Sequence, residues 1–118
     1  MNIEEFRDYC LSKKHVTECF PFDEKTLVFK VKGKVFLLTD IQSNPLQFNV
    51  KCDPEIAIQL RENYSCITPG FHMNKKHWNT IDVNSDLNDE LLLELILDSY
   101  NLVVKSLTKK TRDELSIG

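Results

Sequence analysis

The sequence has few of the residues from which several common sites are built. Its 118 residues include only three glycines, and no GxSxG, HExxH or glycine-rich phosphate-binding motif is present, which argues against those hydrolase and nucleotide sites. The four cysteines are scattered without a CxxC pair, so neither a zinc site nor a thioredoxin-type pair has the spacing that it needs. No apolar run approaches the roughly 18 residues of a membrane span. We therefore expect reduced cysteines, no metal, no cofactor and no enzymatic activity.

The chain also lacks an excess of positive charge. Lys and Arg number 15 against 18 Asp and Glu, and the net charge of −3 argues against a surface that attracts phosphates everywhere. A local basic patch is compatible with this balance, so the arrangement of the lysines matters more than their sum. The segment MNIEEFRDYC at the N-terminus carries acids where a signal peptide carries basic residues and then an apolar run. We expect a cytoplasmic protein that makes no membrane contact.

Hydrophobic periodicity predicts the secondary structure. Hydrophobic residues make up 42% of the chain and charged residues 28%, which is typical of a globular domain, here a single domain over residues 1–118. Helical spacing predicts helices over 2–13, 53–63, 88–107 and 108–115, and alternation predicts a short irregular strand at 17–22, strands at 27–32, 34–40, 46–51 and 77–83, and a loop or short strand at 64–72. In the second helix, Ile56, Ala57 and Leu60 are expected to face inward. Hairpin-linked strands between helices predict an α+β two-layer domain with a largely antiparallel sheet.

The segment PGFHMNKKHWNT, residues 69–80, concentrates polar and aromatic side chains. It holds the only Trp, two of the three His and a Lys pair. Cations beside an aromatic ring in an exposed turn commonly hold a phosphate backbone and stack on exposed bases. We interpret Pro69-Gly70 as the turn, Trp78 as its anchor, and the donors that it presents as Asn74, Lys75, Lys76 and His77. The alternative is that Trp78 is a core residue and the two lysines only solvate a loop.

The two histidines of this segment do not form a recognisable metal or catalytic motif. His72 and His77 are five residues apart, which places them on different faces of a helix, unlike the i, i+4 pair of a zinc helix. A nucleophile–base pair needs a Ser, Cys or carboxylate beside one of them, and the sequence does not identify such a partner. A catalytic role for either histidine therefore ranks lowest among the hypotheses.

A second basic element lies in the hairpin LVFKVKGKVF. Alternation places Lys30 and Lys32 on the face opposite the apolar residues, with Lys34 just past the Gly33 turn. In LQFNVK, Lys51 shares a face with the polar residues of its strand. If these faces align, Lys30, Lys32 and Lys51 line one side of the sheet near a hairpin tip, as in a wing that lies along a DNA backbone. The alternative is a solvated face whose edge lysines discourage aggregation.

Three segments carry a family resemblance: NVKCDPE at 49–55, PGFHMNKKHWNTIDV at 69–83, and the pair SY at 99–100. They resemble the MmcQ/YjbR family of small bacterial proteins over nearly the full chain. The resemblance implies a CyaY-like α+β fold with helices packed on one face of an antiparallel sheet, and a DNA-binding role with a double-wing arrangement. The marked residues of that family fall here on Lys51, Pro54, His72, Asn74, Lys75, His77 and Trp78.

Two functional hypotheses follow. The first is a non-enzymatic DNA-binding protein of low sequence specificity, in which phosphate contacts come from the 74–78 turn and from Lys30, Lys32, Lys34 and Lys51. The second is a module that binds a small anionic ligand or a protein, in which the segment from His72 to Trp78 lines a pocket and Lys51 or Lys75 pairs with an anion. A monomer is the favoured oligomeric state in both.

Overall fold

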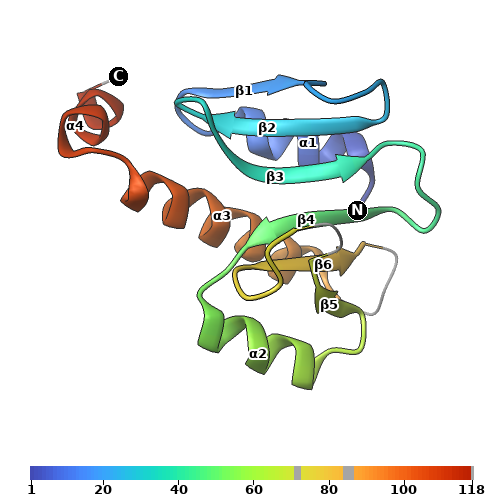
Figure 1. The fold of residues 1–118 in the computed structure, drawn as a ribbon. Helices are drawn as coiled ribbons and strands as arrows, with labels where there is room; N and C mark the ends of the chain where they lie inside the picture. The colour runs from blue at the N-terminus through green and yellow to red at the C-terminus, as the bar shows by residue number, and fades with distance from the viewer. Residues whose placement is uncertain (71–72, 84–86, 118) are drawn as a thin grey trace.

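The chain folds into a six-stranded antiparallel sheet with four helices (Figure 1). The computed structural model describes residues 1–70, 73–83 and 87–117. Along the chain the elements are α1 (Ile3–Leu11), β1 (Val16–Cys19), β2 (Thr26–Val31), β3 (Lys34–Asp40), β4 (Gln47–Lys51), α2 (Pro54–Asn63), β5 (Ile67–Pro69), β6 (Trp78–Asp82), α3 (Asp89–Ser106) and α4 (Lys109–Ile117). Along these residues, no helix is both long and apolar enough to cross a membrane.

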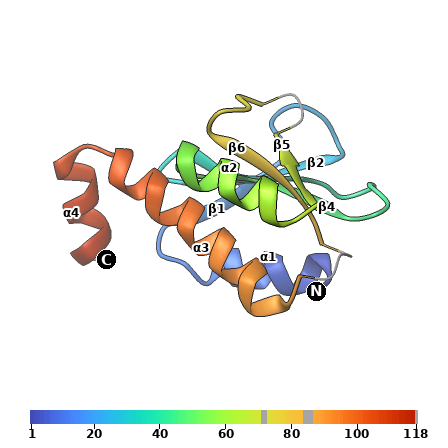
Figure 2. The same ribbon diagram turned by 90° about the horizontal axis from the view of Figure 1, so that it is seen from below.

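The strand order is β1-β2-β3-β4-β6-β5, and every neighbouring pair is antiparallel. Helices α1 and α3 cover one side of the sheet, while α2 runs along the β5 edge and α4 lies beyond one end of the strands (Figures 1 and 2). The predicted α+β class with an antiparallel sheet and helices on one face is therefore confirmed. We call the other side of the sheet, opposite α1 and α3, the open face.

Capping side chains start the first two helices. The side chain of Asn2 accepts a hydrogen bond from the backbone N–H of Glu5 at 2.9 Å, and Asp53 caps α2 in the same way. The expectation that Ile56 faces inward is wrong, because its side chain is 50% exposed. Helix α2 packs mainly against the β5 edge, so it buries Ala57 and leaves Ile56 largely exposed.

The core lies between the sheet and the pair α1 and α3. Its largest buried side chains are phenylalanines from three strands and from α1, namely Phe6, Phe29, Phe36 and Phe48. Phe6 packs against Phe48 with ring centroids 5.7 Å apart, which joins α1 to β4. Burying such side chains is the main stabilising term for a domain of this size.

A β-bulge at Phe36 shapes the end of the sheet where the β2–β3 hairpin turns. Phe29 pairs with Leu37 but Lys30 pairs with Val35, so Phe36 is an extra residue on β3. The two-residue turn, Lys32-Gly33, has positive φ at both positions, 50° and 81°, as a type I′ turn requires. The hydroxyl of Ser99 on α3 completes this region, as it donates to the Phe36 carbonyl at 2.6 Å and accepts from the Lys51 N–H at 2.8 Å.

Candidate functional site

The strand register brings three of the predicted site residues to the open face. Phe48, Val50 and Ile81 belong to the core, so the residues that alternate with them on β4 and β6 point to the open face. Lys51 is the direct cross-strand partner of Trp78. Lys30 faces the same side from β2, where Val28 and Lys30 alternate with core residues. Lys30, Lys51 and Trp78 therefore share one face of the sheet and one end of its strands.

Charge is separated along the strands. The end of β2, the start of β3, the end of β4 and the start of β6 meet at one end of the sheet, on the left in Figure 1, because these strands alternate in direction. This basic end carries Lys30, Lys32, Lys34, Lys51, Lys75 and Lys76. The opposite end carries Asp23, Glu24, Asp40 and Asp82 with the cation Lys25, while Asp53 and Glu114 are acidic residues at the basic end. A chain with a net charge of −3 thus presents a local concentration of lysines.

The hairpin lysines do not all face the same way, which corrects the predicted alignment of Lys32 with Lys30. Lys32 lies in the turn and not in β2, and its Nζ makes an ion pair with Glu114 of α4 at 3.4 Å. Lys34 pairs with Val31, a core residue, so its side chain starts on the helix side of the sheet. Of these three lysines, Lys30 alone belongs to the open face.

The turn before β6 is organised by Asn74. Its carbonyl accepts from the N–H groups of His77 at 3.2 Å and Trp78 at 2.9 Å, and its side-chain oxygen accepts from the N–H of Lys76 at 2.9 Å. The carbonyl of His77 accepts from the N–H of Cys52 at 2.7 Å, which ties the turn to the end of β4. Asn74, Lys75 and Lys76 are exposed and His77 is half-buried, so the turn presents two cations to solvent in the segment that leads to Trp78.

Trp78 lies outside the main hydrophobic core. The core and the partly buried residues packed against it come from the helix side of the sheet, whereas Trp78 starts from the open face. Its side chain is half-buried. The alternative in which Trp78 is a core residue is therefore not supported, and an aromatic surface remains beside Lys51.

Two residues that position the turn were not predicted from the sequence. Arg61 of α2 donates through Nε to Oδ1 of the buried Asn79 at 2.7 Å and through its terminal amino group to the carbonyl of Lys75. Gly70 packs so tightly on β6 that a Cβ there would lie 2.8 Å from Cβ of Trp78. The single arginine in the last turn of α2 was the available signal for the first of these, since such a side chain often bonds nearby carbonyls.

The remaining predicted residues lie away from the open face or outside the described part of the chain. Pro54 occupies the first turn of α2, directly after its cap Asp53, and therefore serves to start the helix. His72 lies outside the described residues. Across the part of the chain that the structure describes, no three His, Cys, Asp or Glu side chains cluster closely enough to hold a metal ion.

A hollow of about 530 Å³ opens on the open face, and its lining includes Asp40. Phe22 from the segment before β2 and Met73 from the segment before β6 line it, together with Leu38 and Asn49 of the sheet. Both segments rise from the sheet on the side away from α1 and α3 (Figure 2). No local pattern predicts that Phe22 and Met73 line the same hollow, because they are 51 positions apart and the fold brings them together.

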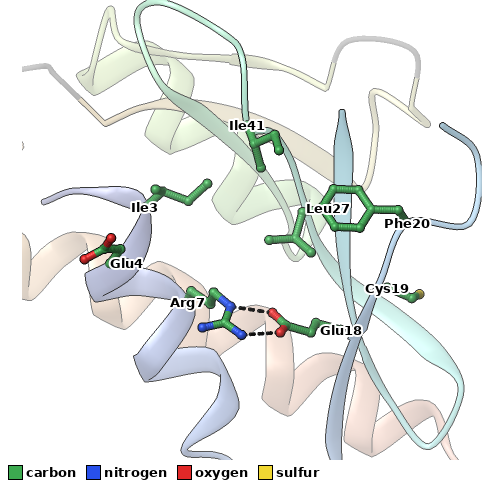
Figure 3. Close-up of a pocket in the computed structure, with 8 residues that line it drawn as sticks. All are labelled: Ile3, Glu4, Arg7, Glu18, Cys19, Phe20, Leu27 and Ile41. Atoms are coloured by element: carbon green, nitrogen blue, oxygen red, sulfur yellow. Dashed lines mark hydrogen bonds and ion pairs between the residues drawn. The ribbon is translucent and has the colours of Figure 1, made fainter. Parts of the chain in front are cut away.

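A second hollow lies on the helix side at the β1 edge (Figure 3). Ile3, Phe20, Leu27 and Ile41 line it, and Arg7 and Glu18 close one end. The guanidinium donates through two nitrogens to the two carboxylate oxygens of Glu18, and this hydrogen bonding raises the pKa of Arg7. Arg7 and Glu18 neutralise each other and Glu4 adds a negative charge, so this hollow offers less to an anion than the open face does.

Burial makes Cys10 and Cys52 poor nucleophiles at neutral pH. All four cysteines are free, and burial raises the pKa of Cys10 to about 12. Burial and the carboxylates of Asp53 and Asp98 raise the pKa of Cys52 to about 11. Thiols with such values are protonated at pH 7 and react slowly.

Known proteins resemble this chain over nearly its whole length. The family model described as YjbR matches residues 11–102. The uncharacterised protein YbdF of Escherichia coli O157:H7 is 36% identical over 115 residues, which covers 98% of this chain and 94% of YbdF. The uncharacterised protein YjbR of Escherichia coli K12 is 30% identical over 112 residues, which covers 95% of each chain.

Solved structures of similar proteins share the fold of this chain. The crystal structure of Deinococcus radiodurans protein DR2400 matches with a TM-score of 0.92 and 43% identity, over 98% of this chain and 88% of that one. A crystal structure from Pseudomonas syringae matches with a TM-score of 0.75 and 28% identity, over 86% of this chain and 98% of that one. The resemblance noted from the sequence is confirmed, and the chain belongs to the YjbR family.

Proposed function

We propose that this chain is a non-enzymatic protein that binds DNA through the basic end of its open face, mainly by phosphate contacts. The observation that carries the proposal is the meeting of Lys30, Lys51 and Trp78 on the one side of the sheet that α1 and α3 leave uncovered. Lysines neutralise phosphates and release counterions, and the ring beside Lys51 offers a stacking surface. The exposed Lys75 and Lys76 extend the same region.

Low sequence specificity fits the same geometry. Sequence is read in the major groove by helices or two-stranded ribbons that carry groups suited to base edges. Helices α1 and α3 face the core, and the exposed residues of α2 include Glu55, Ile58 and Glu62, which suit neither phosphates nor the groove. The hairpin tip is paired with Glu114 of α4, so the contacts in this proposal come from the open face and not from a projecting wing.

The proposal is tested by titrating labelled DNA at several salt concentrations by fluorescence anisotropy. We expect log affinity to fall linearly with log salt, with a slope of about −0.9 for each duplex phosphate that is neutralised. The double variant Lys30→Gln with Lys51→Gln is expected to weaken binding and to make the slope shallower by about 1.5 to 2. The matched control, Lys105→Gln with Lys110→Gln, removes the same charge from α3 and α4 and is expected to change the slope less. Absence of binding at low salt contradicts the proposal.

A second candidate function is binding of a small anionic ligand in the hollow between Phe22 and Met73, with its anionic group held by Lys51, which follows the lining residue Asn49 by two residues on β4. The volume of the hollow, about 530 Å³, falls in the range of small-molecule sites. Thermal stabilisation by nucleotides or other small phosphates, with no response to DNA, favours this candidate over the first.

A further inference from the structure

The hollow on the open face combines apolar walls with a polar group at its base. Phe22 is 72% exposed, the most exposed of the large apolar side chains noted in the structure, although an aromatic ring gains from burial. Leu38 supplies an apolar floor, and Met73, whose thioether packs well on aromatic groups, lines the hollow as well. Such a space suits a flat group with apolar faces.

The Thr26 and Thr39 hydroxyls that also line the hollow donate to Asp23 and to the Gln47 carbonyl, so the donor that the hollow offers is the amide of Asn49. The hydroxyl of Thr80 donates to its Oδ1 at 2.5 Å, which fixes the side chain and leaves the amide NH2 as a donor. Asp40 lines the hollow at the end away from the lysines, and its carboxylate accepts from the N–H of Gln42 at 2.8 Å. A donor and an acceptor at the edge of an apolar space match the edge of a nucleobase.

The charges around the hollow give such a ligand a direction. Lys51 follows Asn49 by two residues on β4, a distance of about 7 Å along a strand, and Lys30 lies two strands away from β4 at the same end. Asp40 lies two residues beyond Leu38 on β3, toward the acidic end. A phosphate is therefore attracted to the Lys51 side and repelled from the Asp40 side, while a base covers the hollow between them.

Duplex DNA does not offer this arrangement. Its bases are stacked on each other and their Watson–Crick edges are paired, and its major groove admits a helix or a two-stranded ribbon but not the face of a six-stranded sheet. A single strand can splay its bases onto aromatic side chains while its backbone follows cations. Trp78, on the same face as the hollow, supplies a second stacking surface beside Lys51.

We propose that the open face binds single-stranded nucleic acid, with one base in the hollow lined by Phe22 and Met73 and an adjoining phosphate at Lys51. This inference rests on the proposed function and narrows its partner from DNA in general to an unpaired strand. The shared chemistry is that of single-stranded DNA and RNA, which differ at this site by the 2′-hydroxyl.

The test uses the full chain and three labelled probes. They are a single-stranded oligothymidylate, an oligouridylate of the same length, and a duplex of the oligothymidylate with oligoadenylate. A length of about 12 nucleotides lies within the usual site sizes of single-strand binders. We expect the unpaired probes to bind at least about tenfold more tightly than the duplex at low salt. Phe22→Ala is expected to weaken binding of the unpaired probes by about 5- to 150-fold, the range of a lost base–aromatic stack. Its exposure lets the variant fold, which circular dichroism verifies.

The matched control is Phe20→Ala, which removes an exposed ring from the second hollow on the helix side and is expected to change binding by less than about twofold. Equal binding of oligouridylate and oligothymidylate supports the inference, and tighter binding of one of them identifies RNA or DNA, respectively, as the preferred strand. If the duplex binds as tightly as the unpaired strand, or if the two Phe variants behave alike, the inference is overturned while salt-dependent DNA binding still stands. If no probe binds at low salt, the proposed function itself fails.

Discussion

Replacement of Ser99 by alanine tests the account of how α3 holds the end of β4 in place. Ser99 is fully buried, and its hydroxyl is shared between the Phe36 carbonyl at 2.6 Å and the Lys51 N–H at 2.8 Å. The pairing of β3 with β4 runs from Thr39–Phe48 to Leu37–Val50 and ends at the bulge. The serine therefore takes the place of the next interstrand bond.

The expected loss in the free energy of unfolding follows from the two backbone groups that lose their hydrogen-bond partner in Ser99→Ala. A buried donor or acceptor left without a hydrogen bond costs about 1–3 kcal/mol, so loss of the hydroxyl is expected to lower the free energy of unfolding by about 2–4 kcal/mol after partial relaxation. That is a large part of the roughly 5–15 kcal/mol by which a domain is stable. With a urea m-value near 2 kcal/mol/M, the midpoint falls by about 1–2 M.

The assay is equilibrium unfolding in urea, followed by circular dichroism for wild type, Ser99→Ala and Ser106→Ala. Ser106 is the matched control, because it lies on the same helix and its hydroxyl donates to the Val103 carbonyl at 2.6 Å, but its side chain is exposed. We expect the control to change stability by less than about 0.5 kcal/mol. A Ser99→Ala midpoint within the same limit, at an unchanged m-value, refutes the assignment of Ser99 as the bridge between β3 and β4.

Two further predictions concern the neighbourhood of the site. Gly70→Ala is expected to destabilise the fold by about 1–3 kcal/mol, because the new Cβ would lie 2.8 Å from Cβ and 3.0 Å from the carbonyl oxygen of Trp78. Trp78 is the only tryptophan of the chain, so a shift of the fluorescence spectrum reports this strain. A spectrum and a urea midpoint equal to those of the wild type contradict the prediction. Burial and the charge of Glu94 raise the pKa of Asp98 in the folded protein above its ordinary value of 3.8. Above the folded-state pKa the ionised carboxylate therefore destabilises the folded state, and below 3.8 the carboxyl is mainly neutral in both states and this effect disappears. Asp98→Asn is therefore expected to raise the urea midpoint at pH 7 and to leave it unchanged at pH 3, and equal effects at the two pH values contradict this assignment.

Much of the fold could be predicted because local patterns agree with the tertiary structure. Alternation in LQFNVK placed Lys51 on the polar face of β4 correctly, since Phe48 and Val50 on the other face meet the helices. Helices α1 and α2 begin directly after Asn2 and Asp53, residue types that favour the capping position, so their predicted starts at 2 and 53 agree closely with the structure. The strand β5 was harder to predict, because its three residues include exposed Thr68 and Pro69 and only Ile67 is buried.

The site was predicted less completely, for reasons that lie in tertiary structure. Lys51 and Trp78 could be assigned to faces by parity, but their pairing depends on β6 lying beside β4. Lys32 departs from the strand pattern because it enters the turn and pairs with Glu114, 82 residues away. The hollow formed by Phe22 and Met73 follows from two loops that rise over the same sheet face, and no local periodicity encodes that.

The net charge of the chain does not describe its local electrostatics, because the topology sorts charges by their position along the strands. Each antiparallel connection alternates between the two ends of the sheet, so a lysine before or after a turn at one end joins the others there, regardless of sequence separation. Lys30, Lys51 and Lys75 come from three parts of the chain and meet at one end, while Asp23, Asp40 and Asp82 meet at the other. At physiological salt, electrostatic interactions are screened over a Debye length of about 8 Å, which is shorter than a strand of five residues. The basic and the acidic end of the sheet therefore act as separate electrostatic fields. A polyanion approaching the open face therefore encounters the lysines as a local field, and the acidic end sets which way it lies.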